Sequence, residues 1–174
     1  MIEYFKKEYL EQAQNQRKKT LIVYFMVLAL YVALSVVVLI RYTQLPYMSE
    51  KIVAIKAVEY VITFFMLVFS FLYLGIKYKR VNKYYHLLKN LQIGLREEFV
   101  ASFFEYDENL STKDGVDVKA LVFLEWNKFK KDYFDRKVWV LYELPFPEIP
   151  EKATVKFVTQ GNVLVSYEIL SEEE

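Results

Sequence analysis

The sequence has no cysteine and only one histidine, His86. Without cysteine the chain cannot form disulfides, thiolate metal sites or a cysteine nucleophile, and one imidazole cannot supply the paired histidines of many catalytic and zinc sites. Glycine is also scarce, and its four occurrences, at positions 75, 94, 115 and 161, are too far apart to form a phosphate-binding loop. We therefore expect no cofactor, no resident metal ion and no enzymatic activity.

Two long apolar segments stand out against these absences. Residues 21–40 carry no charged side chain, and residues 57–76 carry a single one. At about 1.5 Å per residue, a helix of this length extends about 30 Å, which matches the hydrocarbon layer of a bilayer. We predict a membrane α-helical hairpin, with transmembrane helices at 20–41 and 57–76 joined by a short external loop at 42–56.

The basic residues near these segments predict which way the hairpin faces. Four of them follow the second segment at once and form what we call the basic collar: Lys77, Lys79, Arg80 and Lys83. Three more, at 17–19, precede the first segment, whereas the connection between the segments has only Arg41 and Lys51, with Lys56 at its edge. Because Lys and Arg favour the cytosolic side, we expect a protein that crosses the cell membrane twice with both termini in the cytosol. The collar also suits contact with anionic lipid.

Amphipathic segments flank the apolar ones on the predicted cytosolic side. Residues 1–19 place Ile2, Phe5, Tyr9 and Ala13 at helical spacing, and residues 77–96 do the same with Val81, Tyr84, Leu88, Leu91 and Leu95. We predict an N-terminal amphipathic helix and a basic juxtamembrane stalk helix. Their apolar stripes are expected to pair with each other or with those of a second copy.

A few residues inside the apolar segments suggest how the helices pack. Ala29 and Ala33 form a small-residue step on the first segment, where another helix can approach closely. Thr63 and Ser70 form a hydroxyl stripe on the second, for which we expect hydrogen bonds within or between helices. The alternative for this stripe is the lining of an oligomeric pore. Lys56 and Glu59, three residues apart near the start of the second segment, are expected to be anchors at the membrane interface that can pair with each other, and the alternative is an ion or proton site.

From residue 97 the apolar pattern changes from helical spacing to alternation, which predicts strands. Five extended runs are visible, at 99–105, 116–124, 137–144, 153–159 and 163–170. A turn-rich stretch at 107–115 separates the first two, and Gln160-Gly161-Asn162 predicts a tight hairpin between the last two. We predict a small all-β cytosolic domain over 97–174, with about five antiparallel strands in a barrel of oligonucleotide-binding-like or SH3-like closure.

The segment 126–139 mixes basic and aromatic side chains, which suits a nucleotide, another anion or an anionic lipid surface. The candidate contact residues are Trp126, Lys128, Lys130, Lys131, Tyr133, Arg136 and Lys137. Under the alternative interpretation the segment is an ordinary solvated hairpin with Trp126 and Trp139 in the core. Residues 97–174 hold nine basic and seventeen acidic side chains, a balance of −8, so we do not expect nucleic-acid binding.

These features favour a non-enzymatic adaptor or regulatory subunit that is anchored in the membrane and presents its β domain to a partner. Its expected partners are the lipid bilayer and either further copies of itself or another membrane protein. The alternative is a ligand-gated oligomeric effector or pore in which the β domain senses a nucleotide or other anion. No motif in the sequence decides between the two.

Overall fold

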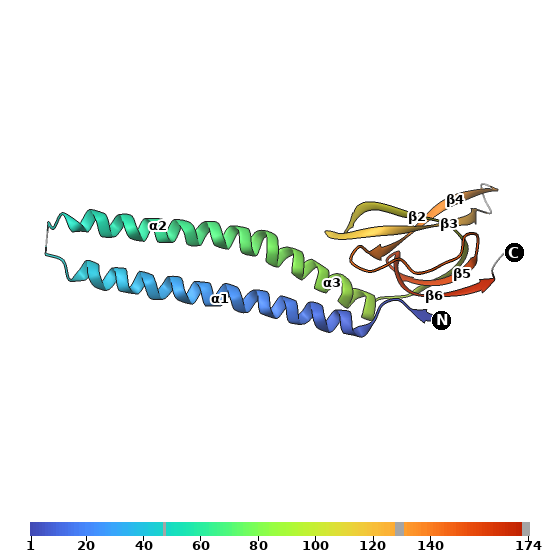
Figure 1. The fold of residues 1–174 in the computed structure, drawn as a ribbon, viewed down its shortest axis with the longest axis horizontal. Coiled ribbons are helices and arrows are strands. Elements are labelled where there is room, and N and C mark those ends of the chain that lie inside the picture. Colours follow the sequence, from blue (N-terminus) through green and yellow to red (C-terminus); the bar gives the residue numbers. More distant parts are fainter. Residues whose placement is uncertain (47, 128–130, 172–174) are drawn as a thin grey trace. The chain divides into compact units, whose positions relative to one another are not determined.

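The computed structural model describes residues 1–46, 48–127 and 131–171, and the chain divides into two compact units. One consists of Gln14–Asn82, and we call it the helical unit. The other joins Met1–Ala13 to Lys83–Glu174, and we call it the barrel unit (Figure 1). The chain therefore starts in the barrel unit, leaves it for the helical unit and returns.

The described helices form two long segments joined by a short loop. They are α1 (Lys7–Thr43), α2 (Lys51–Leu72), the π-helical stretch η1 (Tyr73–Tyr78) and α3 (Lys79–Ile93), the last three being continuous. Lys7–Thr43 and Lys51–Ile93 are both long and apolar enough to cross a membrane, by length and composition. The most apolar stretch of the first helical segment is 0% buried, and that of the second segment is 6% buried. Neither segment is therefore enclosed as the core helix of a soluble domain would be.

The first helix starts later than its apolar pattern predicts. Ile2–Glu3 is a short strand, β1, that pairs antiparallel with a strand near the end of the chain. Phe5 also precedes the helix, and its N–H donates to the Val165 carbonyl at 3.0 Å. Tyr9 and Ala13 do lie in α1 as expected. Hydrogen bonds to a distant strand thus override the local helical spacing at the N-terminus.

The β domain is a small closed barrel, as predicted, but its strands are not all antiparallel. The strands are β2 (Glu97–Lys113), β3 (Val116–Asn127), β4 (Asp132–Leu141), β5 (Thr154–Gln160) and β6 (Val163–Ser171). These described strands close in the order β2-β3-β4-β6-β5, and β1 adds to β6. The contact between β4 and β6, at Trp139 and Val163, is parallel. The reason is arithmetic: around a ring of five strands the directions cannot alternate throughout, so one neighbouring pair must be parallel.

Two tight turns with positive φ angles connect β2 to β3 and β5 to β6. Gly161 and Asn162 have φ angles of 57° and 63°, which confirms the predicted hairpin. Asp114 and Gly115, at 52° and 77°, form the other turn, which is much shorter than the predicted stretch 107–115. Residues 107–113 are instead part of β2, where an irregular register around 107–111 accommodates the additional residues.

Two groups of buried side chains hold the barrel unit together. The first fills the barrel and includes Phe103, Phe123 and Phe157, whose neighbouring ring centroids lie 5.6 Å and 4.4 Å apart. The second group joins the barrel to the helical residues of the same unit: Phe5, Ala13, Leu87, Leu88, Leu91, Val116, Leu141, Val163 and Val165. Leu88 and Leu91 of the predicted stalk stripe are fully buried here, so this end of α3 is fixed to the barrel.

Candidate functional site

The basic and aromatic segment 126–139 spans the β3–β4 hairpin. Trp126 and Tyr133 lie opposite each other on the two strands, with ring centroids 4.9 Å apart in an edge-to-face arrangement. Trp126 is 48% exposed and Tyr133 is 62% exposed, so the expectation of Trp126 in the core is wrong. Phe123 points into the core, and strand alternation places Trp126, three residues later, on the other side of the sheet. Trp139 does pack against the second buried group.

Arg136 is engaged by its neighbours in the barrel. Its Nη1 donates to Glu125 Oε2 at 2.8 Å, and its guanidinium carbon lies 3.3 Å from the centre of the Phe99 ring. Only 18% of the arginine side chain is exposed. An arginine held by a carboxylate and an aromatic ring is part of the barrel wall, and an anionic ligand would have to displace Glu125 to reach it.

Lys137 is also paired within the barrel unit. Its Nζ donates to Asp107 Oδ2 at 2.8 Å, and Asn109 donates to the other oxygen of the same carboxylate. The hydrogen bond from Lys137 lowers the pKa of the Asp107 carboxyl group, and Asp107 in turn raises the pKa of the Lys137 ammonium. Both charges are therefore neutralised locally.

The remaining basic candidates are not gathered into a site by the described structure. Lys131 is exposed and itself has a φ angle of 53°. Lys128 and Lys130 lie outside the described residues. The described residues of the predicted contact set are thus two cations with internal partners, one exposed lysine and two exposed aromatic side chains.

Apolar side chains gather on the outer side of β2, β3 and β4. Continuing the β2–β3 register by two residues places Val100 opposite Trp126, and Val100 is 56% exposed. Phe104 occupies the register irregularity in β2 and is 50% exposed. We call Val100, Phe104, Trp126 and Tyr133 the outer aromatic face. Val100 and Phe104 are not among the contact residues predicted from the sequence. The run 99–105 does carry a signal for them, because its apolar residues occupy both even and odd positions, so some of them must lie on the outer side of the strand.

The basic collar is divided between the two units. The helical unit contains Lys77, Lys79 and Arg80, and the barrel unit contains Lys83. Lys77 Nζ lies 5.1 Å from the centre of the Tyr73 ring. Lys83 covers Gly115 so closely that a Cβ atom at this position would clash with the lysine side chain. Lys83 therefore packs on the β2–β3 turn, a contact that its charge alone does not predict.

Side-chain hydrogen bonds link α1 to α2 within the helical unit. The hydroxyl oxygens of Tyr24 and Ser70 are 3.4 Å apart, and those of Tyr31 and Thr63 are 3.2 Å apart. The predicted hydroxyl stripe thus forms hydrogen bonds between helices, one of the two arrangements expected from the sequence. Bonds of this kind contribute about 0.6–2 kcal/mol each when helices pack in a bilayer.

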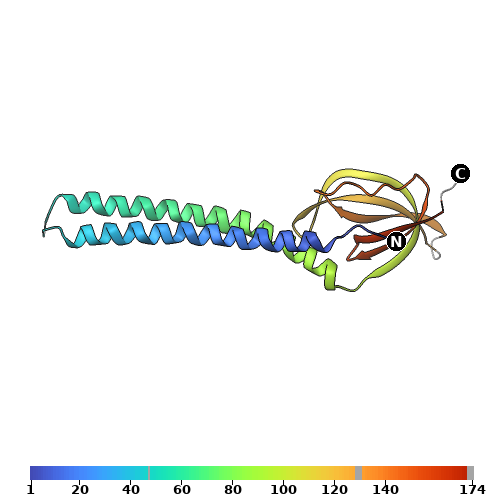
Figure 2. The same ribbon diagram turned by 60° about the horizontal axis from the view of Figure 1, so that its bottom comes forward.

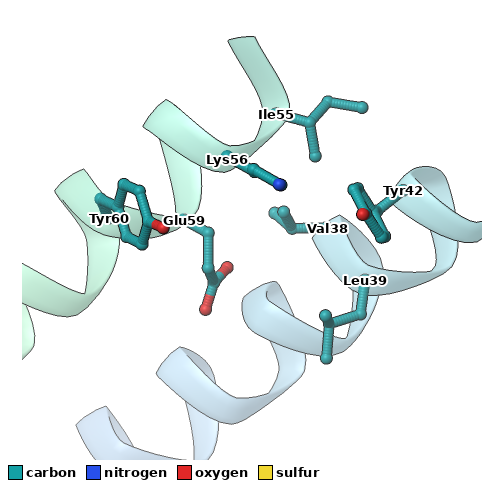
Figure 3. Close-up of a pocket in the computed structure, with 7 residues that line it drawn as sticks. All are labelled: Val38, Leu39, Tyr42, Ile55, Lys56, Glu59 and Tyr60. Carbon is teal, nitrogen blue, oxygen red and sulfur yellow. The ribbon is translucent and has the colours of Figure 1, made fainter. Parts of the chain in front are cut away.

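Two polar side chains, Ser35 of α1 and Glu59 of α2, lie one helical turn away from the hydrogen bond between Tyr31 and Thr63. Ser35 follows Tyr31 by four residues and Glu59 precedes Thr63 by four, and the Ser35 Oγ and Glu59 Oε2 atoms are buried with no hydrogen bond in the described part of the chain. Glu59 lines a pocket of about 180 Å³ together with Val38, Leu39, Tyr42, Ile55, Lys56 and Tyr60. Glu59 points toward α1 and Lys56 toward Tyr42 in this pocket (Figure 3). A buried carboxylate oxygen without a hydrogen-bond donor costs free energy, so we expect Glu59 to lower the stability of the hairpin.

Ala29 and Ala33 are exposed in the helical unit. The face of α1 that contacts α2 carries Tyr24 and Tyr31 instead. The small-residue step therefore does not serve the contact between α1 and α2, and it remains open to another helix.

Together these features define a two-helix hairpin that carries a closed five-stranded mixed β-barrel with an exposed aromatic face. In comparisons with known proteins, no family model, curated protein or solved structure matches the chain.

Proposed function

We propose that the protein is a non-enzymatic, membrane-anchored adaptor or regulatory subunit that docks a partner protein through the outer aromatic face. The observation that carries this proposal is the exposure of Trp126 and Tyr133, at 48% and 62%, with Val100 opposite Trp126 by register and the exposed Phe104 further along β2. Grouped apolar side chains on a surface commonly mark an interaction site, and Trp and Tyr are the residues that most often dominate protein interfaces.

The internal ion pairs favour a protein partner over an anion. A ligand that used Arg136 or Lys137 would have to compete with Glu125 or Asp107, each at 2.8 Å. The surplus of acidic side chains over 97–174 would also repel an anion. Because Arg136 and Lys137 are engaged in these ion pairs, the exposed aromatic side chains beside them are better suited to the side chains of another protein.

We further propose that α1 and α2 cross the cell membrane with both termini in the cytosol. The length and apolar character of Lys7–Thr43 and Lys51–Ile93 support this, as does the position of the basic collar next to the second apolar segment. The bilayer is then one partner. The exposed step of Ala29 and Ala33 offers a contact for a second copy or for a partner membrane helix.

Photo-crosslinking in cells of the source organism tests the docking face. Benzoylphenylalanine replaces Tyr133 in one variant and, as a control, Tyr142, which is 51% exposed and lies outside the outer aromatic face. We expect one discrete cross-linked protein from position 133, none from position 142, and loss of the product when Trp126→Ala is added. No product at 133, or the same product at both positions, contradicts the proposal.

The alternative, a ligand-gated effector, is tested with the purified full-length protein. It predicts saturable thermal stabilisation by a nucleotide and damage to the membrane when the protein is produced in cells. The adaptor proposal predicts neither, so a nucleotide that raises Tm in the wild type but not in Lys137→Ala would favour the effector.

A further inference from the structure

Strand β4 is paired on one side only along most of its length. β3 pairs with every residue of β4 from Asp132 to Leu141, whereas β6 meets β4 only where Trp139 lies opposite Val163. Residues 132–138 therefore present a backbone edge that no described strand covers. Small five-stranded barrels of the oligonucleotide-binding type are partly open in the same general way. The start of β4 lies at the end of the barrel away from the part of α3 in the same unit (Figures 1 and 2).

One hydrogen bond fixes the direction of the backbone groups along this edge. Trp139 donates its N–H to the Asn162 carbonyl at 2.7 Å, which points away from β3. The β3–β4 register is continuous, and backbone direction alternates along an antiparallel strand. The N–H and C=O groups of Tyr133, Asp135 and Lys137 therefore also point to the open edge.

The open edge is partly capped by a side chain. Asp132 Oδ1 accepts a hydrogen bond from the Tyr133 N–H at 2.8 Å, so this outward N–H is satisfied. No described residue outside the β3–β4 pair bonds to the backbone of Asp135 or Lys137. Proteins protect exposed edges with charged side chains of this kind, and the protection can be exchanged for a partner strand.

The charges beside the edge specify what such a strand should carry. Arg136 and Lys137 are neutralised by Glu125 and Asp107, while Asp135 has no ion pair with a described residue. Asp135 lies on the same side of β4 as Tyr133, because the two are separated by two residues. A strand added here would place one side chain opposite Asp135 and the next outward one beside the outer aromatic face.

We propose that the edge of β4 over 132–138 receives an extended segment of the partner protein as an additional strand. The segment carries Lys or Arg opposite Asp135 and an apolar residue two positions away, against Tyr133. This inference rests on the proposed adaptor function, for which it supplies the mode of binding. Backbone hydrogen bonds to Asp135 and Lys137 provide affinity, and the basic and apolar side chains provide specificity.

A synthetic peptide serves as the probe for the full-length protein in nanodiscs. The fluorescently labelled peptide Thr-Val-Thr-Lys-Thr-Val-Thr has the required pattern in either strand direction, and the same peptide with Asp in the central position is its control. We expect the Lys peptide to bind saturably and the Asp peptide at least about tenfold more weakly. N-methylation of alternate peptide residues should abolish binding for one set of positions and not for the other, because only one edge of the peptide faces β4.

Variants of Asp135 separate the backbone from the charge. Asp135→Pro removes an N–H that makes no bond to β3, so the barrel is expected to fold and the Lys peptide to bind about tenfold more weakly. Asp135→Lys should invert the preference toward the Asp peptide, whereas the control Glu151→Lys, an exposed acid outside β4, should not. Should Asp135→Pro fail to fold by near-UV circular dichroism, the inversion and the N-methyl series still decide the matter.

The possible failures are distinguishable. No saturable binding of the Lys peptide, or binding that is indifferent to N-methylation, overturns strand addition. If Asp135→Pro also leaves the cross-link at position 133 intact while Trp126→Ala abolishes it, the adaptor proposal stands and docking involves the aromatic face alone. If neither variant affects the cross-link, both proposals fall. A particle mass that doubles only when the β4 edge is intact would identify a second copy as the occupant and overturn the partner segment.

Discussion

The substitution Arg136→Ala tests whether Arg136 stabilises the barrel or is available to bind a ligand. We expect Arg136→Ala to lower the unfolding free energy of the barrel unit by about 2–3 kcal/mol. A hydrogen bond to a charged group contributes about 1.5–3 kcal/mol, and a cation–π contact such as that with Phe99 about 0.5–1 kcal/mol. The 18% exposure of Arg136 limits screening by solvent, although the 33% exposure of Glu125 keeps the estimate at the lower end.

The assay is thermal unfolding of the full-length protein in detergent, followed by the near-UV circular dichroism of its aromatic residues. For a barrel of this size, 1 kcal/mol corresponds to a Tm change of roughly 4–8 °C, so Arg136→Ala should unfold about 10–20 °C below the wild type. Lys137→Ala is the matched control, because its side chain is 49% exposed and its ion pair is better screened. Its Tm should fall much less.

A double-mutant cycle between Arg136 and Glu125 completes the test. We expect a coupling energy of about 1 kcal/mol or more, since the two side chains are in direct contact. The reasoning would be refuted by a Tm for Arg136→Ala as high as that of Lys137→Ala, together with a coupling energy near zero. Arg136 would then be free to bind an anion, and the ligand-sensing alternative would gain support.

Three further outcomes can be checked in the same system. Phe123→Ala should cost about 3–5 kcal/mol in denaturant unfolding, because the ring is fully buried in the barrel, while Trp126→Ala should cost less than about 1 kcal/mol; equal costs would contradict the assignment of the two faces. Asp107→Asn should lower Tm at neutral pH. The pKa of Asp107 is lowered in the folded state, so the ion pair stabilises the protein fully above the ordinary pKa of 3.8 and less as the pH falls through the lower pKa of the folded state. The Tm difference between Asp107→Asn and the wild type should therefore vanish at that low pH. A Tm difference that is independent of pH would exclude the ion pair as its source. Glu59→Gln should stabilise the hairpin against unfolding by SDS by about 1–3 kcal/mol, since a neutral amide replaces a carboxylate with a buried, unpaired oxygen, and a loss of stability would show that the carboxylate has a partner.

The elements with strong apolar periodicity could be predicted from the sequence. The uninterrupted run at 21–40 leaves little alternative to a long apolar helix, and the alternation at 116–124 gives β3 almost unaided. The tight turn at Gly161-Asn162 could be predicted because both residues tolerate a positive φ angle. In each case the signal is local, so no distant contact was needed to interpret it.

The candidate site could be predicted only in part, because its character depends on distant pairs. The basic residues Arg136 and Lys137 are visible in the sequence, but their partners lie on other strands, and only the barrel register brings Glu125 and Asp107 to them. Trp126 was misassigned because a large aromatic residue at a strand end is equally compatible with either face until the parity relative to Phe123 is known. The presence of one parallel pair could have been deduced, since a closed ring with an odd number of strands requires it, but the strand order is needed to identify that pair as β4 and β6.

The pairing of β1 with β6 has a consequence for the order in which the protein is made. The ribosome synthesises Ile2–Glu3 well before its partner strand, Val163–Ser171, and the whole of Gln14–Asn82 is made in between. Ile2–Glu3 can therefore form their hydrogen bonds to β6 only after the rest of the barrel has been translated. If the hairpin enters the membrane as proposed, its insertion can begin before the barrel is able to close, and biogenesis would then follow the sequence membrane first, soluble domain second.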